Sequence, residues 1–251
     1  MGRLIVLGTA NAVANEHHEN THFVLLVGER AIMVDCVGNP VIRLRQVGID
    51  FNQVTDLILT HFHPDHVSGM PLLLMDMWLM QRKRPLHIYG LKHTIDRAIT
   101  TMTLYEWETW PNFFPVIFHR LPDEERATIL DEPEVRVFAS PGDHHIPTIG
   151  IRIEFPNIAR SVAYSSDTEP CDAIARLAEN VDVLIHEASG ASVGHSSAAQ
   201  AGEVAQRAGA QQLYLVHYPP EAKPEALVSA ARTGFQGPIH LATDLMEITL
   251  V

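Results

Sequence analysis

Three histidines and an aspartate follow directly on a short apolar run. Residues 57–60 are predicted to form a buried strand, because an apolar run without helical periodicity is typical of a strand covered on both faces. His61 and His63 come next and lie two residues apart, so they project to the same side of an extended chain. The proline after them ends the strand and favours a helical turn, which leaves Asp65 and His66 facing the same point.

These residue types at this spacing predict a metal site. Imidazole nitrogens and carboxylate oxygens are the ligands that zinc and similar divalent ions take in proteins. A lone histidine is usually a surface residue or a satisfied core residue. Burying three imidazoles and a carboxylate together, however, is costly unless a cation pairs with them. The strand followed by a turn is also the structural context that such a motif requires.

Reactive side chains recur where other predicted strands end. The predicted strands 161–165, 181–185 and 213–216 are each followed by a side chain that can bind a metal or move a proton. In order along the chain, these side chains are Asp167, Glu187 and His217. Because open α/β sheets assemble their sites at the carboxyl ends of strands, we expect them to meet.

Two further positions are expected near the site. The loop between the predicted strands 135–139 and 149–155 holds His144 and His145, and a shift of one loop residue would exchange them. Asp35 ends the predicted strand 31–35 and could hydrogen-bond a metal-bound imidazole.

Helices are predicted between these strands. Residues 40–47, 71–81 and 94–105 have helical character, and Ser197 with Gln200 forms a capping box for a helix that Gly209 closes. Asp172 is expected to cap the helix that follows it. No fixed-period repeat or Gly/Ser/Pro-rich linker divides the chain, so a single domain over residues 1–251 is predicted.

The segment HFHPDH at residues 61–66 resembles the HxHxDH signature of the metallo-β-lactamase fold superfamily. The branch with ribonuclease Z and related phosphodiesterases is matched by five more motifs in order: LGT at 7–9, VDC at 34–36, HEAS at 186–189, GHSS at 194–197 and LVH at 215–217. The resemblance covers nearly the whole chain. It implies an α/β fold with the layers of an αββα sandwich.

The resemblance also implies two divalent metal ions, with zinc the first choice and manganese or iron acceptable. The family's histidine three residues before a proline selects His144 over His145. One ion would be bound by His61, His63 and His144, and the other by Asp65, His66 and His217, with Asp167 bridging both. Ions about 3.5–4 Å apart would hold a shared water as hydroxide and leave open positions, as catalytic sites do.

The expected catalytic residues are Asp65, His195 and Glu187. In ribonuclease Z-like phosphodiesterases the histidine matched by His195 acts with the glutamate matched by Glu187 to protonate or position the leaving oxygen. The resemblance therefore favours a phosphodiesterase with His195 as general acid. The alternative for His195 is that it merely caps the following helix.

Several features argue against precursor-tRNA processing. The chain carries 18 Lys+Arg against 30 Asp+Glu, a formal charge of −12, whereas proteins that hold extended nucleic acid normally carry a basic stripe. Its one basic run, residues 81–84, is interpreted as a solvated helix end. Only 22 residues (145–166) separate His144 from Asp167, too few for the long arm of ribonuclease Z. Pro64 stands where that family usually has glycine, and residues 15–20 are acidic and histidine-rich where it has a basic loop.

The predicted substrate is therefore a small or loosely held phosphodiester. Ribonuclease Z proper, a lactonase or other C–O or C–N hydrolase, and a catalytically silent metal-binding scaffold remain as alternatives.

Two apolar segments have no assigned role. The Met- and Leu-rich helix 71–81 suits core or subunit packing, so a homodimer is considered. An aromatic cluster is expected to pack in the core or a dimer contact, or else to wall the site; it comprises Tyr105, Trp107, Trp110, Phe113, Phe114 and Phe118.

The cysteines and the hydropathy indicate the cellular compartment that we expect. Neither of the two cysteines belongs to a CxxC pair, so a reducing compartment such as the cytoplasm fits. No segment is long enough to span a membrane.

Overall fold

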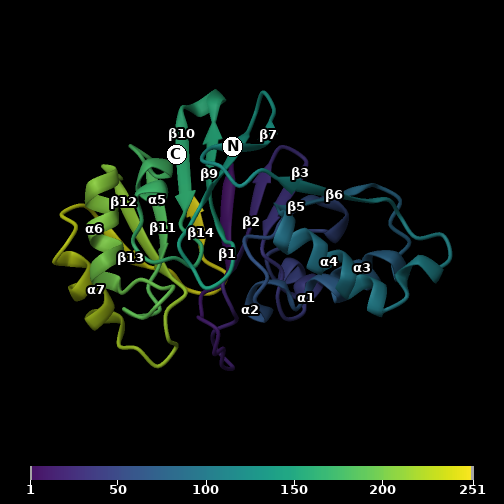
Figure 1. Cartoon of the computed structure of the whole chain (residues 1–251), viewed down its shortest axis with the longest axis horizontal. Coiled ribbons are helices and arrows are strands. Elements are labelled where there is room, and N and C mark those ends of the chain that lie inside the picture. The colour runs from purple at the N-terminus through teal and green to yellow at the C-terminus, as the bar shows by residue number, and fades with distance from the viewer. Residues whose placement is uncertain (1, 250–251) are drawn as a thin grey trace.

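A computed structural model describes residues 2–249 and shows two seven-stranded sheets with helices on both outer sides (Figure 1). The first sheet has the order β14-β1-β2-β3-β4-β5-β6. Its strands are β1 (Arg3–Gly8), β2 (His22–Val27), β3 (Arg30–Val34), β4 (Val54–Ile58), β5 (Leu86–Leu91), β6 (Val116–Leu121) and β14 (Glu247–Thr249). The helices of this half are α1 (Pro40–Gln46), α2 (Pro64–Val67), α3 (Met70–Leu79) and α4 (Lys92–Leu104).

The second sheet has the order β13-β12-β11-β10-β9-β8-β7. Its strands are β7 (Ala127–Asp131), β8 (Arg136–Pro141), β9 (Ile149–Phe155), β10 (Arg160–Tyr164), β11 (Val183–Glu187), β12 (Gln212–Val216) and β13 (Ile239–Leu241). Its helices are α5 (Asp172–Leu177), α6 (Ala198–Ala208) and α7 (Pro224–Arg232), and they lie on the side away from the first sheet (Figure 1). Three short 3₁₀ turns complete the structure: Phe51–Gln53, Trp107–Thr109 and Pro156–Ile158.

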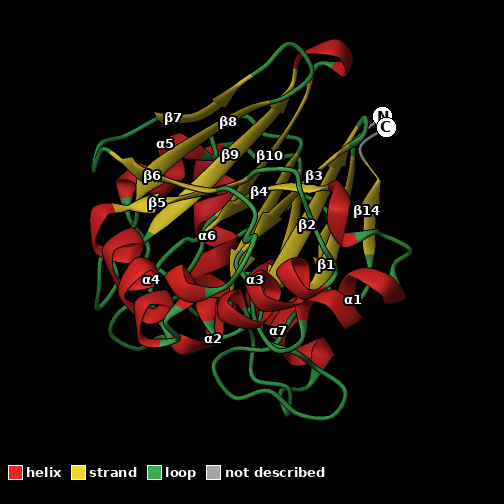
Figure 2. Ribbon diagram, turned by 90° about the vertical axis from the view of Figure 1, so that its right-hand side faces the viewer, coloured by secondary structure: helices red, strands yellow, loops and turns green. Residues whose placement is uncertain are grey.

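Each sheet contains four consecutive parallel strands. In the first sheet β3, β4, β5 and β6 pair in parallel, and in the second β10, β11, β12 and β13 do so. The remaining pairs are antiparallel. The carboxyl ends of the parallel strands therefore lie at the same end of each sheet, and the chain runs from there into the helices (Figure 2).

Three apolar clusters hold the layers together. The first lies between the two sheets and includes Val34 and Ile58 from one sheet and Ile151 and Ile185 from the other. The second lies between the first sheet and α1, α3 and α4, and the third between the second sheet and its helices. The predicted αββα sandwich is thereby confirmed. None of the helices within residues 2–249 is both long and apolar enough to cross a membrane.

Most of the predicted elements are confirmed within a few residues. The capping box of Ser197 and Gln200 starts α6, and Gly209 ends it with a φ of 67°. The predicted strand 57–60 is shifted, because β4 pairs with β3 from Val54 and already ends at Ile58.

Two local predictions were wrong. Asp172 does not cap α5; it is the first residue of that helix, and its carboxylate accepts a hydrogen bond from Arg207 of α6 instead. Residues 81–84 are not simply a solvated helix end, because the Arg82 side chain is buried. Its guanidinium donates to backbone carbonyls that lie far away in the sequence, those of Phe51 and Val54 among them.

Candidate metal centre

The carboxyl ends of strands from both sheets meet at one end of the sandwich. In the first sheet, the segment after β4 carries His61 and His63, and α2 carries Asp65 and His66. In the second sheet, Asp167 follows β10, Glu187 ends β11 and His217 follows β12, while the loop from β8 to β9 supplies His144. The backbone N–H of Ile149 donates to the carbonyl of Thr60 at 3.1 Å, which joins the two halves beside the site.

The predicted ligands form two groups of donor atoms. His61, His63 and His144 make the first group, and Asp65, His66, Asp167 and His217 make the second. Within each group the candidate ligand atoms lie within 4.8 Å of one another. We call these the first and second donor groups.

Asp167 connects the two donor groups. Its Oδ2 atom lies 3.4 Å from Nε2 of His66 and 3.4 Å from Nε2 of His217, both in the second donor group. The same oxygen is 3.8 Å from Nε2 of His61 in the first donor group. Asp167 is therefore placed to face both groups.

Hydrogen bonds behind the rings decide which nitrogen faces the site. Nδ1 of His66 donates to Oδ2 of Asp35 at 2.7 Å, and Nδ1 of His144 donates to the carbonyl of Gly194 at 2.6 Å. The Asp35 carboxylate also accepts from the backbone N–H and the hydroxyl of Thr60. With their protons committed outward, the Nε2 lone pairs of both rings point into the site, as metal-ligating imidazoles require.

Several buried polar atoms in the site have no hydrogen-bond partner within residues 2–249. They include Nε2 of His61, Nε2 of His66 and Oδ1 of Asp167. Nε2 of His144 and Nδ1 of His63 face each other at 3.0 Å. Buried polar atoms without a partner are costly. A divalent cation in each donor group would satisfy all of them, so the residues fit two such ions.

The electrostatics favour cations as well. Burial lowers the pKa of His61 well below its usual value, which leaves the ring neutral. Burial alone would raise the pKa of Asp167, but the charges of His217 and His66 outweigh it and hold that pKa well below the usual range. Neutral imidazoles and ionised carboxylates are the forms that bind metals. Burial similarly opposes protonation of His66, yet the charges of Asp167 and Asp35 raise its pKa well above normal, a sign of strong negative potential.

His195 and Glu187 lie together at the edge of the donor groups. Nδ1 of His195 lies 3.0 Å from Oε1 of Glu187 and 3.9 Å from Oδ2 of Asp167. Glu187 is fully buried, and the backbone N–H groups of Thr168 and Ser189 each donate to it at 3.0 Å. The hydrogen bond that His195 donates to the Glu187 carboxylate raises the pKa of His195. Ser197, not His195, caps α6, so the helix-cap alternative for His195 was wrong.

The structure separates the two neighbouring histidines of the β8–β9 loop. His144 lies in the first donor group, whereas His145 is exposed and outside both groups. Gly194 contacts both rings; its φ is +79°, and a Cβ there would lie 2.8 Å from Nδ1 of His144. Sequence reasoning missed this carbonyl partner of His144, because a backbone oxygen leaves no signal in residue type.

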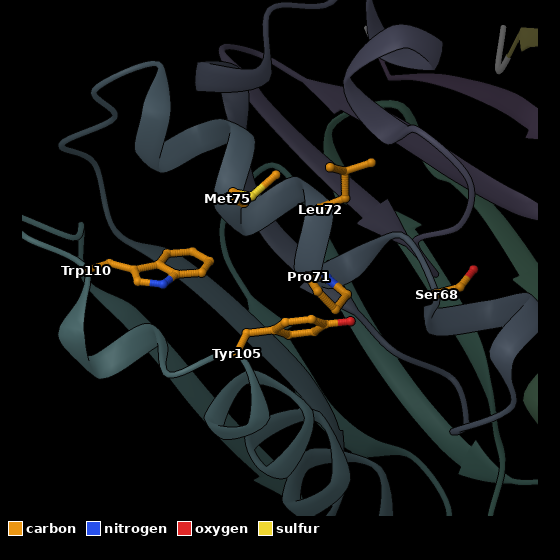
Figure 3. A pocket seen from close by; sticks show the side chains of 6 residues that line it. All are labelled: Ser68, Pro71, Leu72, Met75, Tyr105 and Trp110. Atoms are coloured by element: carbon orange, nitrogen blue, oxygen red, sulfur yellow. The ribbon is translucent and has the colours of Figure 1, made fainter.

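Most of the aromatic cluster packs against the core between the first sheet and its helices. Phe114 is buried, the rings of Trp78 and Trp110 stack at 4.8 Å, and their neighbours pack against the helices of the first sheet. The core interpretation is thus confirmed for these rings. Tyr105 and Trp110 also line an apolar hollow of about 250 Å³ with Ser68, Pro71, Leu72 and Met75 (Figure 3).

Known proteins match almost the entire chain. The family described as anti-Pycsar protein Apyc1 matches residues 2–241. Ribonuclease Z of Mycobacterium sp. (strain KMS) is 30% identical over 278 residues, which span 99% of this chain and 96% of that protein.

Solved structures share the fold. The metallo-β-lactamase fold protein YhfI of Bacillus subtilis superposes with a TM-score of 0.83 at 21% identity, covering 98% of each chain. The short form of human tRNase Z superposes with a TM-score of 0.81 at 24% identity, again over 98% of each chain.

Proposed function

The chain belongs to the anti-Pycsar protein Apyc1 family, in the ribonuclease Z-like branch of the metallo-β-lactamase fold superfamily, and from this premise we propose that it is a dinuclear phosphodiesterase. Its relatives make it a metal-dependent hydrolase. The bond that it cleaves is the proposal: a P–O bond in a small or loosely held phosphodiester. The observation that carries it is the pair of His195 and Glu187, 3.0 Å apart beside two donor groups.

The donor groups would hold the two ions. His61, His63 and His144 would bind one and Asp65, His66 and His217 the other, with Asp167 between them. Zinc fits these nitrogen and oxygen ligands, and manganese or iron would also accept them. When bound, two such ions supply Lewis-acid catalysis and activate water near neutral pH.

The protein's own residues would orient this chemistry and move a proton. Asp35 and the carbonyl of Gly194 hold the rings of His66 and His144, so their Nε2 atoms stay directed inward. Glu187, itself fixed by two backbone N–H groups, accepts a hydrogen bond from Nδ1–H of His195. The Nε2–H of His195 then protonates the leaving oxygen as its bond to phosphorus breaks. A general acid of this kind typically contributes about 10²–10⁴-fold in rate.

A small substrate is favoured by what surrounds the site. The connection from β8 to β9 spans only residues 142–148, so no extended arm rises there. The formal charge of −12 opposes a long polyanion. Ribonuclease Z activity is the second candidate, because the curated relative at 30% identity carries that name.

The test compares leaving groups. Metal-analysed wild type and His195→Ala would be assayed on an alkyl phosphodiester, a p-nitrophenyl phosphodiester, a lactone and a precursor tRNA. We expect His195→Ala to lose about 10²–10⁴-fold on the alkyl diester and far less on the p-nitrophenyl diester, whose anion departs without a proton. His240→Ala, an exposed histidine of β13, is the matched control.

The other outcomes separate the alternatives. Lactone cleavage at the same rate in wild type and His195→Ala would overturn the phosphodiesterase proposal. Efficient cleavage of precursor tRNA alone would favour the second candidate. A metal-loaded protein that is inert towards every substrate would favour a non-catalytic scaffold.

We also propose that the apolar hollow of Figure 3 marks a homodimer contact. Tyr105, which lines the hollow, is 57% exposed. Leu79 and Leu104, the last residues of α3 and α4, are 59% and 79% exposed, so both helices end in apolar side chains that face solvent. Light scattering should give a dimer mass for the wild type and a monomer mass for Leu104→Glu. Val13→Glu changes a comparably exposed apolar residue (73%) on the loop after β1 and should leave the mass unchanged. A monomeric wild type would refute the contact.

A further inference from the structure

His145 is an exposed histidine at the site with no structural role in view. Neither of its ring nitrogens makes a hydrogen bond to any of residues 2–249, and it lies outside both donor groups. The other histidines of the β8–β9 and β11–α6 loops, His144 and His195, each have a fixed partner. His145 therefore presents two ring nitrogens without a hydrogen-bond partner beside the first donor group.

The position of its ring is nevertheless well defined. The ring centroid of His145 is 5.2 Å from that of His144 and 6.3 Å from that of His195. Its Nε2 would lie 3.1 Å from a Cβ at Gly194, so the ring rests against the backbone of that glycine. His145 thus faces both the first donor group and His195.

The site offers few other groups for a substrate. Among residues 2–249, no lysine or arginine makes an ion pair or a hydrogen bond with any side chain of the two donor groups, or with those of His195 or Glu187. Imidazole rings are therefore among the groups that can contact the parts of a substrate beyond its phosphate. On the His195 side, the free imidazole is that of His145.

We propose that His145 is a specificity-determining residue that hydrogen-bonds a hydroxylated leaving group next to the oxygen that His195 protonates. This inference rests on the proposed phosphodiesterase activity. An imidazole ring has two nitrogens that can take part in hydrogen bonds, and an alcohol hydroxyl can pair with either of them. The His145 ring lies beside His195, so it reaches atoms just beyond the leaving oxygen and does not act at phosphorus itself. A leaving group with a neighbouring hydroxyl, as in a sugar or glycerol, would be preferred over its deoxy counterpart.

The test uses three phosphodiesters with a common retained half. Their leaving groups are glycerol, propanol and p-nitrophenol, and kcat/KM is measured for metal-analysed wild type, His145→Ala, His145→Gln and the control His240→Ala. We expect His145→Ala to lose about 10- to 100-fold on the glyceryl diester, the usual cost of leaving a polar partner unpaired, and less than about threefold on the other two. His145→Gln keeps a donor and an acceptor and should recover part of the loss.

Each other outcome is decisive. An equal loss on all three diesters, or a changed metal content, would mean that His145 only supports His144, and the proposal would be overturned. No loss on any diester would show that His145 does not contact the leaving group, and this too would overturn the proposal. If the wild type cleaved none of the three, the phosphodiesterase assignment itself would fall, which is a different result from either.

Discussion

Buried polar groups at one end of the sandwich have hydrogen-bond partners within the chain, whereas several at the other end have none within residues 2–249. At the amino ends of β4 and β5 the Arg82 guanidinium, from a residue that is only 2% exposed, donates to the carbonyls of Phe51, Val54, Arg84 and Pro85 at 2.6–3.1 Å. At the carboxyl ends of the strands, Nε2 of His61, Nε2 of His66 and Oδ1 of Asp167 are buried without a hydrogen-bond partner within residues 2–249.

The contrast shows how one fold separates stability from chemistry. A buried cation whose partners belong to the chain stabilises the fold and leaves nothing to bind. Buried acceptors that converge without a donor need a cation from outside the chain, and they stay available for function. We therefore expect substitutions at the two ends to affect different measurements.

The largest expected effect is at the metal end. Asp167→Asn removes the carboxylate that faces both donor groups, so the protein should lose bound metal and about 10²–10⁴-fold in kcat/KM, since metal ions contribute several kcal/mol to such reactions. Elemental analysis and diester assays measure this. Asp172→Asn, an exposed carboxylate on α5, is the matched control. If Asp167→Asn kept two metals and full activity, Asp167 would not join the two donor groups functionally.

Substitution of Arg82, at the opposite end, should change the stability of the fold and leave its activity almost unchanged. Arg82→Met leaves four backbone carbonyls short of a donor, so urea unfolding should show a loss of roughly 2–4 kcal/mol. Activity per folded molecule should stay within about twofold. Arg84→Met, at an exposed neighbour, should change the free energy of unfolding by no more than about 0.5 kcal/mol. A loss of activity at unchanged stability in Arg82→Met would contradict the separation of stability from chemistry between the two ends.

The same two ends show what a sequence can reveal. The residues of the donor groups could be predicted to come together because their chemistry is local: His61 to His66 lie within six residues, and Asp167 and His217 follow apolar strands whose ends meet in sheets of this class. The fold followed from ordered motifs and strand patterns. The choice between His144 and His145 did not follow from spacing alone, because one residue of loop decides it.

What the sequence did not predict depends on distant partners. Arg82 looks like any basic residue at a helix end, and only the carbonyls of Phe51 and Val54, about thirty positions away, make it a core residue. β13 and β14 have three residues each and exist through pairing with β12 and β1. Short edge strands have too few residues to show a periodic pattern.

The smallest expected effect concerns His22, a histidine at the metal end that belongs to neither donor group. It is fully buried, and its Nδ1 donates to the carbonyl of Asn20 at 2.8 Å, while its Nε2 has no partner within residues 2–249. Burial, with the charges of Arg43 and His66, lowers its pKa to about 4. A single unpaired nitrogen in this position is tolerated because the ring remains neutral.

This pKa makes the folded state sensitive to acid. Between about pH 6.5 and 4 the unfolded chain, with an ordinary histidine pKa near 6.5, binds a proton at His22, whereas the folded chain does not. The contribution of His22 to stability is therefore complete above about pH 6.5 and is lost as the pH falls towards 4. At pH 5 the loss from this residue should be about 2 kcal/mol. Urea unfolding at pH 7.5 and pH 5 would compare wild type with His22→Gln, which shares every other titrating histidine. A shallower pH dependence in His22→Gln would show that an isolated buried imidazole resists protonation. Identical pH dependence in the two proteins would mean that the acid sensitivity comes from the donor groups alone.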